Sequence, residues 1–221
     1  MQEHHIEVRK TARYYTLGNP SPDIRTVGFF CHGYRQLGGR FLSQLTRLDD
    51  GHRLLVAPEG LHRFYVEEST SFHGKDSRIG ASWMTAEDRA YEISDYVAYL
   101  DQVYERIFES VDRTSVNVVA VGFSQGAAAV ARWVASGRAR VDRTVLWSGL
   151  LPPDLDVEGF RRNMGKPVAL VMGRDDELIS KQLVRKAQEK MQADNILYDL
   201  IEFEGGHRLD LEVMERVVLK E

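Results

Sequence analysis

The hydrophobic residues of this chain fall into short, almost uninterrupted runs. These runs are TVGFFC (26–31), RLLVA (53–57), VNVVAV (116–121), RTVLW (143–147) and PVALVM (167–172). Strands that are covered on both faces have such continuous runs, whereas half-exposed strands alternate between apolar and polar residues. The pattern therefore predicts a buried, parallel set of strands. The N-terminal stretches IEVRK and YYTLG could add antiparallel strands at one edge, and LYDLIEF (197–203) suits the opposite edge.

Segments between these runs repeat apolar residues every three or four positions, as amphipathic helices do. The clearest helix covers 86–108, with Ala90, Ile93, Val97, Leu100, Tyr104 and Ile107 on one face and a capping box formed by Thr85 and Asp88. A second helix follows Ser180 with Leu183, Ala187 and Met191 on one face, and a third, near Asp210 to Lys220, carries Val213 and Val217. Alternating strands and helices predict an α/β fold with a mostly parallel central sheet and helices on both faces, in a single domain over 1–221.

Two connections bear on access to a site. Residues 60–84 form the longest irregular stretch, and long loops in compact domains are often functional, so this stretch is expected to wall a binding site. The segment between RTVLWSG and GKPVALV has only about fifteen residues, too few for a large helical lid. We therefore expect an open site.

The run VNVVAV ends in Gly122-Phe123-Ser124-Gln125-Gly126 and passes directly into an alanine-rich segment. A serine between two glycines, at the junction of a buried strand and a helix, is the pattern of a nucleophile elbow, whose tight turn lifts the hydroxyl off the sheet. A serine hydroxyl needs a base to remove its proton, and the base needs an acid to orient it. Ser124 is therefore the candidate nucleophile, and the two partners should follow later in the chain.

Both partners occur after later strands. GRDDELIS follows PVALVM and supplies two adjacent acids, of which Asp176 is favoured and Asp175 stays open. EGGHRLD follows the last strand and supplies His207 as the base. The order Ser, Asp, His is that of α/β-hydrolases. Four other histidines lack an acid after an upstream strand: His32, His52, His62 and His73.

The oxyanion formed by attack on a carbonyl needs two backbone donors. One is the N–H of Gln125, directly after the nucleophile and at the positive end of a helix. The second should come from the loop after an early central strand, where CHGYRQLGG places the N–H of Tyr34. His32 is then a structural residue of that loop.

Charge and composition exclude several classes of function. The 221 residues carry 29 basic and 33 acidic side chains, a formal net charge of −4, without a basic stripe, so no nucleic-acid partner is expected. The charged start MQEHHIEVRK and the lack of an apolar run near ~18 residues argue against a secretory signal and integral membrane association, which leaves a cytoplasmic location. The one cysteine, Cys31, allows no intrachain disulfide and suits a buried site. No metal or cofactor is expected, and a homodimer is compatible with the sequence.

Taken together, FFCHGY, VGFSQG, GRDDELI and GGH resemble the phospholipase/carboxylesterase group of the α/β-hydrolase superfamily, which includes acyl-protein thioesterases. The resemblance covers roughly residues 26–210. Its acid pattern Gly-x-x-Asp-x-x-Val fits Gly173, Asp176 and Ile179 and so supports Asp176. The chain departs from the group at Tyr34 and Arg35, where a small or aliphatic residue usually follows His-Gly, and at Glu177, where proline is common.

The resemblance implies a serine carboxylesterase that hydrolyses small to medium acyl esters through an acyl-serine, without a cofactor. Residues expected to build the acyl pocket are Tyr34, Leu37, Phe64, Tyr65, Trp83 and Leu150. An acyl thioesterase or lysophospholipase would use the same triad, and an acyltransferase or perhydrolase would differ in what captures the acyl-enzyme. A non-catalytic binding protein on a hydrolase scaffold is the alternative from another class.

Overall fold

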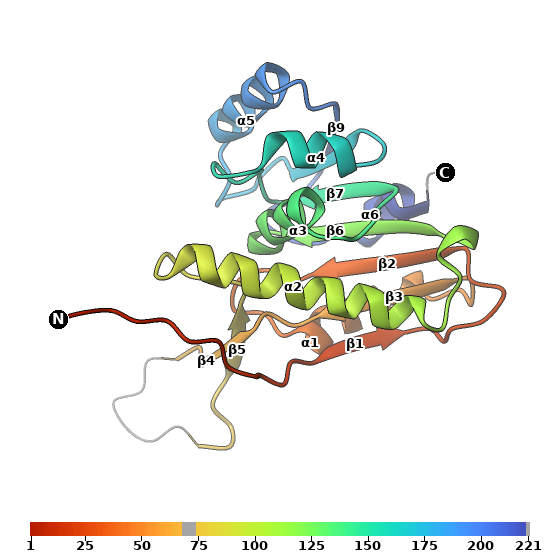
Figure 1. The fold of residues 1–221 in the computed structure, drawn as a ribbon. Coiled ribbons are helices and arrows are strands. Elements are labelled where there is room, and N and C mark those ends of the chain that lie inside the picture. Colours follow the sequence, from red (N-terminus) through yellow and green to blue (C-terminus); the bar gives the residue numbers. More distant parts are fainter. Residues whose placement is uncertain (68–73, 220–221) are drawn as a thin grey trace.

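The computed structural model of the protein describes residues 1–67 and 74–219, with a sheet between two layers of helices (Figure 1). Its strands are β1 (Tyr14–Leu17), β2 (Thr26–Cys31), β3 (Arg53–Pro58), β4 (His62–Tyr65), β5 (Ile79–Ser82), β6 (Asn117–Phe123), β7 (Arg143–Trp147), β8 (Val168–Gly173) and β9 (Tyr198–Phe203). Its α-helices are α1 (Gly38–Leu42), α2 (Arg89–Phe108), α3 (Gln125–Ser136), α4 (Val157–Asn163), α5 (Lys181–Ala193) and α6 (Leu211–Leu219), and its 3-10 helices are η1 (Ser43–Leu48) and η2 (Arg113–Ser115).

Within the described residues, seven strands form the main sheet in the order β1-β3-β2-β6-β7-β8-β9. All neighbours are parallel except β1, which pairs antiparallel with β3. The five predicted buried strands and both predicted edges at YYTLG and LYDLIEF are confirmed. The expectation of a strand at IEVRK is wrong: this exposed stretch forms no strand, because the edge is already occupied by β1 and the chain start runs to α2, where His5 stacks on Tyr91.

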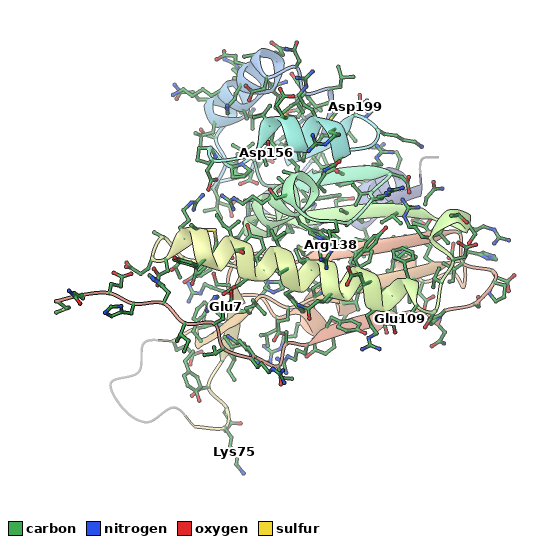
Figure 2. All side chains as sticks on the ribbon, viewed as in Figure 1. Glu7, Lys75, Glu109, Arg138, Asp156 and Asp199 are labelled. Atoms are coloured by element: carbon green, nitrogen blue, oxygen red, sulfur yellow. The ribbon has the colours of Figure 1, made fainter. Side chains whose placement is uncertain are left out.

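Helices cover both faces of the sheet, as predicted. On one face, α2, α3, α4 and α5 bury Tyr96, Trp133, Phe160 and Met191 in the larger core cluster. On the other face, α1, η1 and α6 bury Phe41, Leu45, Met214 and Val217 in a second cluster. Charged side chains such as Arg138, Asp156 and Asp199 are exposed on the surface (Figure 2). The burial on both faces explains why the central strands are almost continuously apolar.

The start of α2 differs from its prediction. The helix begins at Arg89, not at Ala86, and no capping box forms, because Asp88 has a left-handed backbone with φ of 46° and its side chain caps nothing. Instead, the carboxylate of Glu92 reaches back from the first turn of the helix and accepts from the N–H of Thr85. Ala90 is exposed, so the apolar face begins one turn later than the spacing suggested.

The two later helices follow their predictions with one exception. Ser180 Oγ accepts from Leu183 N–H at 3.3 Å and caps α5, but Leu183 itself is exposed and Val184 packs on the core in its place. For α6, Asp210 Oδ1 accepts from Val213 N–H at 3.1 Å. Lys220, the predicted end of that helix, lies outside the described residues.

Part of 60–84, which was expected to be irregular, forms two short strands. β4 and β5 pair antiparallel as a separate two-stranded sheet, while 68–73 lie outside the described residues. This hairpin rests on the loop after β2: Arg35 N–H donates to Ala81 O at 2.9 Å, and Ala81 N–H donates to Gln36 O at 3.0 Å. The approach is close enough that a Cβ on Gly80 would lie 2.6 Å from Arg35 O. The hairpin therefore braces the loop that the sequence linked to the oxyanion.

The connection from β7 to β8 contains the short helix α4 and is tied down by Asp154. This carboxylate lies 2.6 Å from Arg132 Nη2 of α3 and 2.8 Å from Arg89 Nη2 of α2. Burial raises the pKa of Asp154, but hydrogen bonds from the two arginines outweigh burial and lower it to about 2. The connection is thus held against two helices of one face.

Candidate active site

Ser124 stands between the end of β6 and the start of α3, in a strained turn with φ of 54° and ψ of −117°. The turn is crowded on both sides, because a Cβ on Gly122 would lie 2.2 Å from Gly126 O and a Cβ on Gly126 would lie 2.1 Å from Cys31 O. Only glycine fits at either position. The predicted strand-to-helix elbow is therefore formed, and it holds a serine in a conformation that L-residues rarely adopt.

The carboxyl ends of the parallel strands bring the predicted acid and base together. His207, after β9, lies with Nδ1 2.9 Å from Asp176 Oδ2 and 3.1 Å from Oδ1, and Asp176 follows β8. The Asp176 side chain is only 1% exposed and that of His207 12%. Asp175, the alternative acid, is exposed, and within the described part of the chain only its backbone N–H forms a hydrogen bond, 3.0 Å from Gly205 O.

Asp176 is held in its charged form by its surroundings. Burial raises the pKa of this carboxyl group, but hydrogen bonds from His207 and from the backbone N–H groups of Ile179 and Leu178 outweigh burial, and the net shift is downward. Both backbone donors lie 2.9 Å from Oδ1. An ionised carboxylate at Nδ1 keeps the proton on that nitrogen and leaves Nε2 free to accept one.

Ser124 and His207 line one cavity of ≈ 400 Å³. The His207 ring packs against Phe123, the residue before the serine, with 5.1 Å between ring centroids. In the described part of the chain, Ser124 Oγ and His207 form no hydrogen bond. Catalytic hydrogen bonds are often long before substrate binds, so this geometry is compatible with a serine and base that close on a substrate.

The loop after β2 is ordered around His32, which is fully buried. His32 Nε2 accepts from Gly60 N–H at 2.9 Å, so Nδ1 carries the proton and donates to Gly33 O at 2.8 Å. Burial lowers the pKa of this histidine and favours the neutral ring that both bonds require. Fixing the Gly33 carbonyl also fixes the peptide plane that carries the N–H of Tyr34.

The N–H groups around Tyr34 are engaged, whereas its own has no acceptor among the described residues. Gly33 N–H donates to Gln36 Oε1 at 2.7 Å and Arg35 N–H to Ala81 O. Gly33 also approaches the elbow, since a Cβ there would lie 3.2 Å from Ser124 Cβ. The Tyr34 peptide is therefore available beside the serine.

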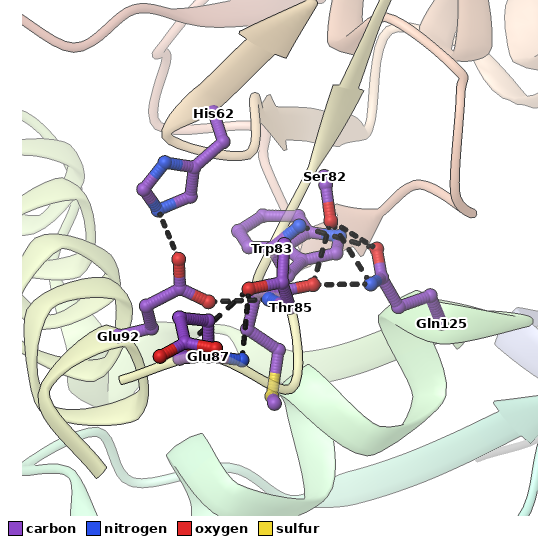
Figure 3. Close-up of polar contacts among 8 residues, drawn as sticks. His62, Ser82, Trp83, Thr85, Glu87, Glu92 and Gln125 are labelled. Atoms are coloured by element: carbon purple, nitrogen blue, oxygen red, sulfur yellow. Dashed lines mark hydrogen bonds and ion pairs between the residues drawn. The ribbon is translucent and has the colours of Figure 1, made fainter. Parts of the chain in front are cut away.

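The side chain of Gln125 clamps the segment before α2, a role that the sequence did not suggest (Figure 3). Its Oε1 accepts from Trp83 N–H at 3.1 Å, and its Nε2 donates to Ser82 Oγ and to Met84 O, both at 3.0 Å. Trp83 Nε1 donates in turn to His32 O at 2.7 Å. These bonds connect the elbow to the loop after β2 through a buried tryptophan.

The structure brings few of the predicted pocket residues to the cavity of Ser124. Tyr34 lines it and stacks on Phe64, with 5.3 Å between ring centroids. Leu37, Phe64, Tyr65, Trp83 and Leu150 do not line it. Trp83 is fully buried against His32 and Tyr96, Tyr65 is exposed, Leu150 packs on the larger core cluster, and Leu37 is half-buried before α1.

The cavity contains residues that the sequence reasoning missed. Leu178 and Leu209 supply apolar lining, and Gln36, Gln44 and Arg208 supply polar lining. Leu178 and Leu209 each lie two positions after the candidate acid and base, so the loops that deliver Asp176 and His207 deliver these side chains too. This two-residue spacing could have predicted both leucines as lining residues.

Two features of the described residues lie outside the cavity. Glu3, His5 and Asp88 bring ligand atoms within 4.8 Å of one another, but all three are exposed and none lines the cavity of Ser124. No described helix combines the length and apolar character needed to cross a membrane.

Comparison with known proteins gives a family and a fold. The family model for Phospholipase/Carboxylesterase matches residues 80–219. Among solved structures, acyl-protein thioesterase 2 from Zea mays is 14% identical with a TM-score of 0.66, covering 94% of this chain and 96% of that chain. Esterase PE8 is 20% identical with a TM-score of 0.65, covering 95% and 100%. A phospholipase/carboxylesterase from Dyadobacter fermentans is 16% identical with a TM-score of 0.65, covering 97% and 99%. No curated protein sequence matches the chain.

At these identities the solved structures establish the fold alone, and the family model establishes the group. The resemblance noted from FFCHGY, VGFSQG, GRDDELI and GGH is thereby confirmed. The chain belongs to the phospholipase/carboxylesterase family and has the α/β-hydrolase fold of that family.

Proposed function

We propose that this chain is a serine hydrolase that cleaves carboxylic esters through an acyl-serine intermediate. The observation that carries the proposal is the buried Asp176–His207 pair, 2.9 Å apart, at the cavity that also holds the strained Ser124. Membership of the family supports esterase or thioesterase activity in general. The assignment of Ser124, Asp176 and His207 as catalytic residues, and of a carboxylic ester as substrate, is our proposal.

In the first half of the reaction, Nε2 of His207 takes the proton of Ser124 Oγ as the oxygen attacks the ester carbonyl carbon. The carbonyl oxygen becomes negative and is stabilised by the N–H groups of Tyr34 and Gln125. The tetrahedral intermediate collapses when the carbon–oxygen bond to the alcohol breaks and His207 returns the proton to that alcohol. Asp176 stabilises the imidazolium throughout but takes no proton.

In the second half, water replaces the alcohol. His207 removes one proton from water as it attacks the acyl carbon, and a second oxyanion forms in the same place. Its collapse releases the carboxylic acid and returns the proton to Ser124 Oγ. A thioester would follow the same steps with a thiol as leaving group.

The test is hydrolysis of p-nitrophenyl acetate, butyrate, octanoate and palmitate by the wild type, Ser124→Ala and, as matched control, Ser94→Ala, an exposed serine of α2. We expect Ser124→Ala to lose turnover and the acyl-enzyme adduct detectable by mass spectrometry, with an unchanged melting temperature, while Ser94→Ala retains both. Turnover that persists in Ser124→Ala would remove serine catalysis. Wild-type protein inactive on all four esters, and on the matching acyl thioesters, would favour a binding protein on this scaffold.

A further inference from the structure

The charged lining of the Ser124 cavity has one sign. Arg35 from the loop after β2 and Arg208 beside the candidate base both line it, and Gln36 and Gln44 add amide groups. No aspartate or glutamate among the described residues lines this cavity. A cavity with this lining attracts anions, because no acidic side chain in its described lining balances the positive charges of its two arginines.

Arg35 is held in place but leaves most of its guanidinium unused. Its backbone has φ of 68° and is pinned by the 2.9 Å bond to Ala81 O. Among the described residues, its guanidinium makes one hydrogen bond, from Nη2 to Val66 O at 3.0 Å, and no carboxylate lies within 4.0 Å of it. A guanidinium has five N–H donors, so the remaining donors are available to a ligand.

Arg208 is more fully engaged. Its Nη1 lies 3.6 Å from Asp210 Oδ2 and its Nη2 donates to Glu204 O at 3.0 Å. Two other acids contact the His207 segment: Asp176 accepts hydrogen bonds from His207 and from two backbone N–H groups, and Glu177 Oε2 lies 3.5 Å from the backbone nitrogen of His207. Arg35 is therefore the strongest unbalanced charge at the cavity, and Arg208 is secondary.

We propose that the preferred ester carries a second oxyanion, a carboxylate or a phosphate, and that Arg35 binds it. Arginine pairs with such groups through two parallel hydrogen bonds, which orient the ligand as well as attract it. The pinned backbone reduces the entropy lost when the side chain engages. This inference rests on the proposed function, because it names the substrate class of the same serine.

A carboxylate on the acyl side is tested with mono-p-nitrophenyl adipate against its neutral methyl ester, which has the same chain and leaving group. We expect the wild type to favour the anionic ester by about tenfold in kcat/KM, mainly through KM, because hydrogen bonds to charged groups are typically worth that much or more. Arg35→Gln should reduce the preference to near unity, and Arg35→Lys should retain part of it. Added salt should reduce the wild-type preference as well.

A phosphate on the alcohol side is tested with 2-acetoxyethyl phosphate against 2-acetoxyethanol, by titrating the acid released. The pair that shows an Arg35-dependent preference identifies which group is bound. Arg40→Gln is the matched control, since Arg40 is exposed on α1 and does not line the cavity, so this variant should keep the wild-type preference. If Arg35→Gln fails to fold, Arg35→Lys gives the answer, because lysine keeps the charge but not the two parallel hydrogen bonds: a reduced preference supports the proposal, and the full wild-type preference overturns it.

Two results would overturn the inference: equal kcat/KM within both pairs for the wild type, or an anionic preference that Arg35→Gln retains in full. Either result, together with Ser124-dependent hydrolysis of the neutral esters, would leave the proposed function standing. Loss of that Ser124 dependence would instead refute the proposed function itself.

Discussion

Replacing Asp176 with asparagine should stop His207 from acting as a base, while the side chain at position 176 keeps its place. Asp176 Oδ1 accepts from two backbone N–H groups at 2.9 Å, so the amide oxygen of an asparagine should keep that place. The amide NH₂ would then take the place of Oδ2, 2.9 Å from His207 Nδ1. Because NH₂ is a donor, His207 must present Nδ1 without its proton and carry the proton on Nε2, which then cannot accept from Ser124.

The wrong tautomer in a serine triad lowers kcat by about 10⁴-fold, and we expect Asp176→Asn to lose about 10³–10⁴-fold here. The fold should survive, with a loss of about 1–3 kcal/mol for the weakened hydrogen bonds of a buried charged group. Asp175→Asn is the neighbouring control: this exposed side chain makes no bond in the described structure, so the change should stay within about twofold. The assay is kcat for p-nitrophenyl butyrate, with circular dichroism melting to verify folding.

Either of two outcomes would contradict this reasoning. An Asp176→Asn variant that keeps more than about a tenth of wild-type kcat would show that the tautomer does not limit the reaction. An Asp175→Asn variant that loses as much as Asp176→Asn would move the acid to the neighbouring residue. A pH profile of each variant separates a lost base from lost binding.

Three shorter predictions test other parts of the structure. Gly126→Ala would place a Cβ 2.1 Å from Cys31 O and should lower the free energy of unfolding, measured by urea denaturation, by about 2–3 kcal/mol. The control is Gly74→Ala, at an exposed position with nothing in the described structure within 4 Å, which should lower it little. Equal losses for the two variants would refute the crowded elbow. Asp154 has a pKa lowered to about 2, so its ion pairs stabilise the fold above about pH 4 and less as pH falls toward 2. Asp154→Asn should therefore lower the free energy of unfolding by about 1 kcal/mol at neutral pH, a value kept small because the carboxylate is partly exposed. If the difference in unfolding free energy between variant and wild type stays the same at low pH, the ion pairs of Asp154 are not its cause. A histidine acts as a base only in its neutral form, so the wild-type kcat/KM should fall in acid, and a profile that does not change with pH would exclude a histidine base.

Most of the fold could be predicted because its central strands are buried on both faces, which leaves an unmistakable apolar run. The errors occur where one local contact outweighs a local pattern. Thr85 and Asp88 suit a capping box, but Glu92 binds the Thr85 N–H and Asp88 turns left-handed. Likewise Leu183 fits the helical spacing, yet the neighbouring position faces the core.

The candidate triad could be named from the sequence because each member follows a recognisable strand and strand ends converge. The pocket could not, because its walls come from loops whose relative positions depend on tertiary packing. Trp83 illustrates this difference: it was expected in the acyl pocket, but its indole N–H donates to His32 O in the protein interior. Aromatic residues near a motif are uncertain pocket predictions for this reason.

The clamp made by Gln125 has a consequence for the order in which the protein becomes functional during folding. Gln125 lies 42 residues after Trp83, so the clamp closes a long loop and cannot form from local contacts. Strand β6 and helix α3 can fold together before this contact forms, but the loop after β2 would then lack the hydrogen bond from Trp83. The central sheet and helices would therefore form before the surroundings of Ser124 are complete. After refolding, secondary structure should return earlier than hydrolytic activity.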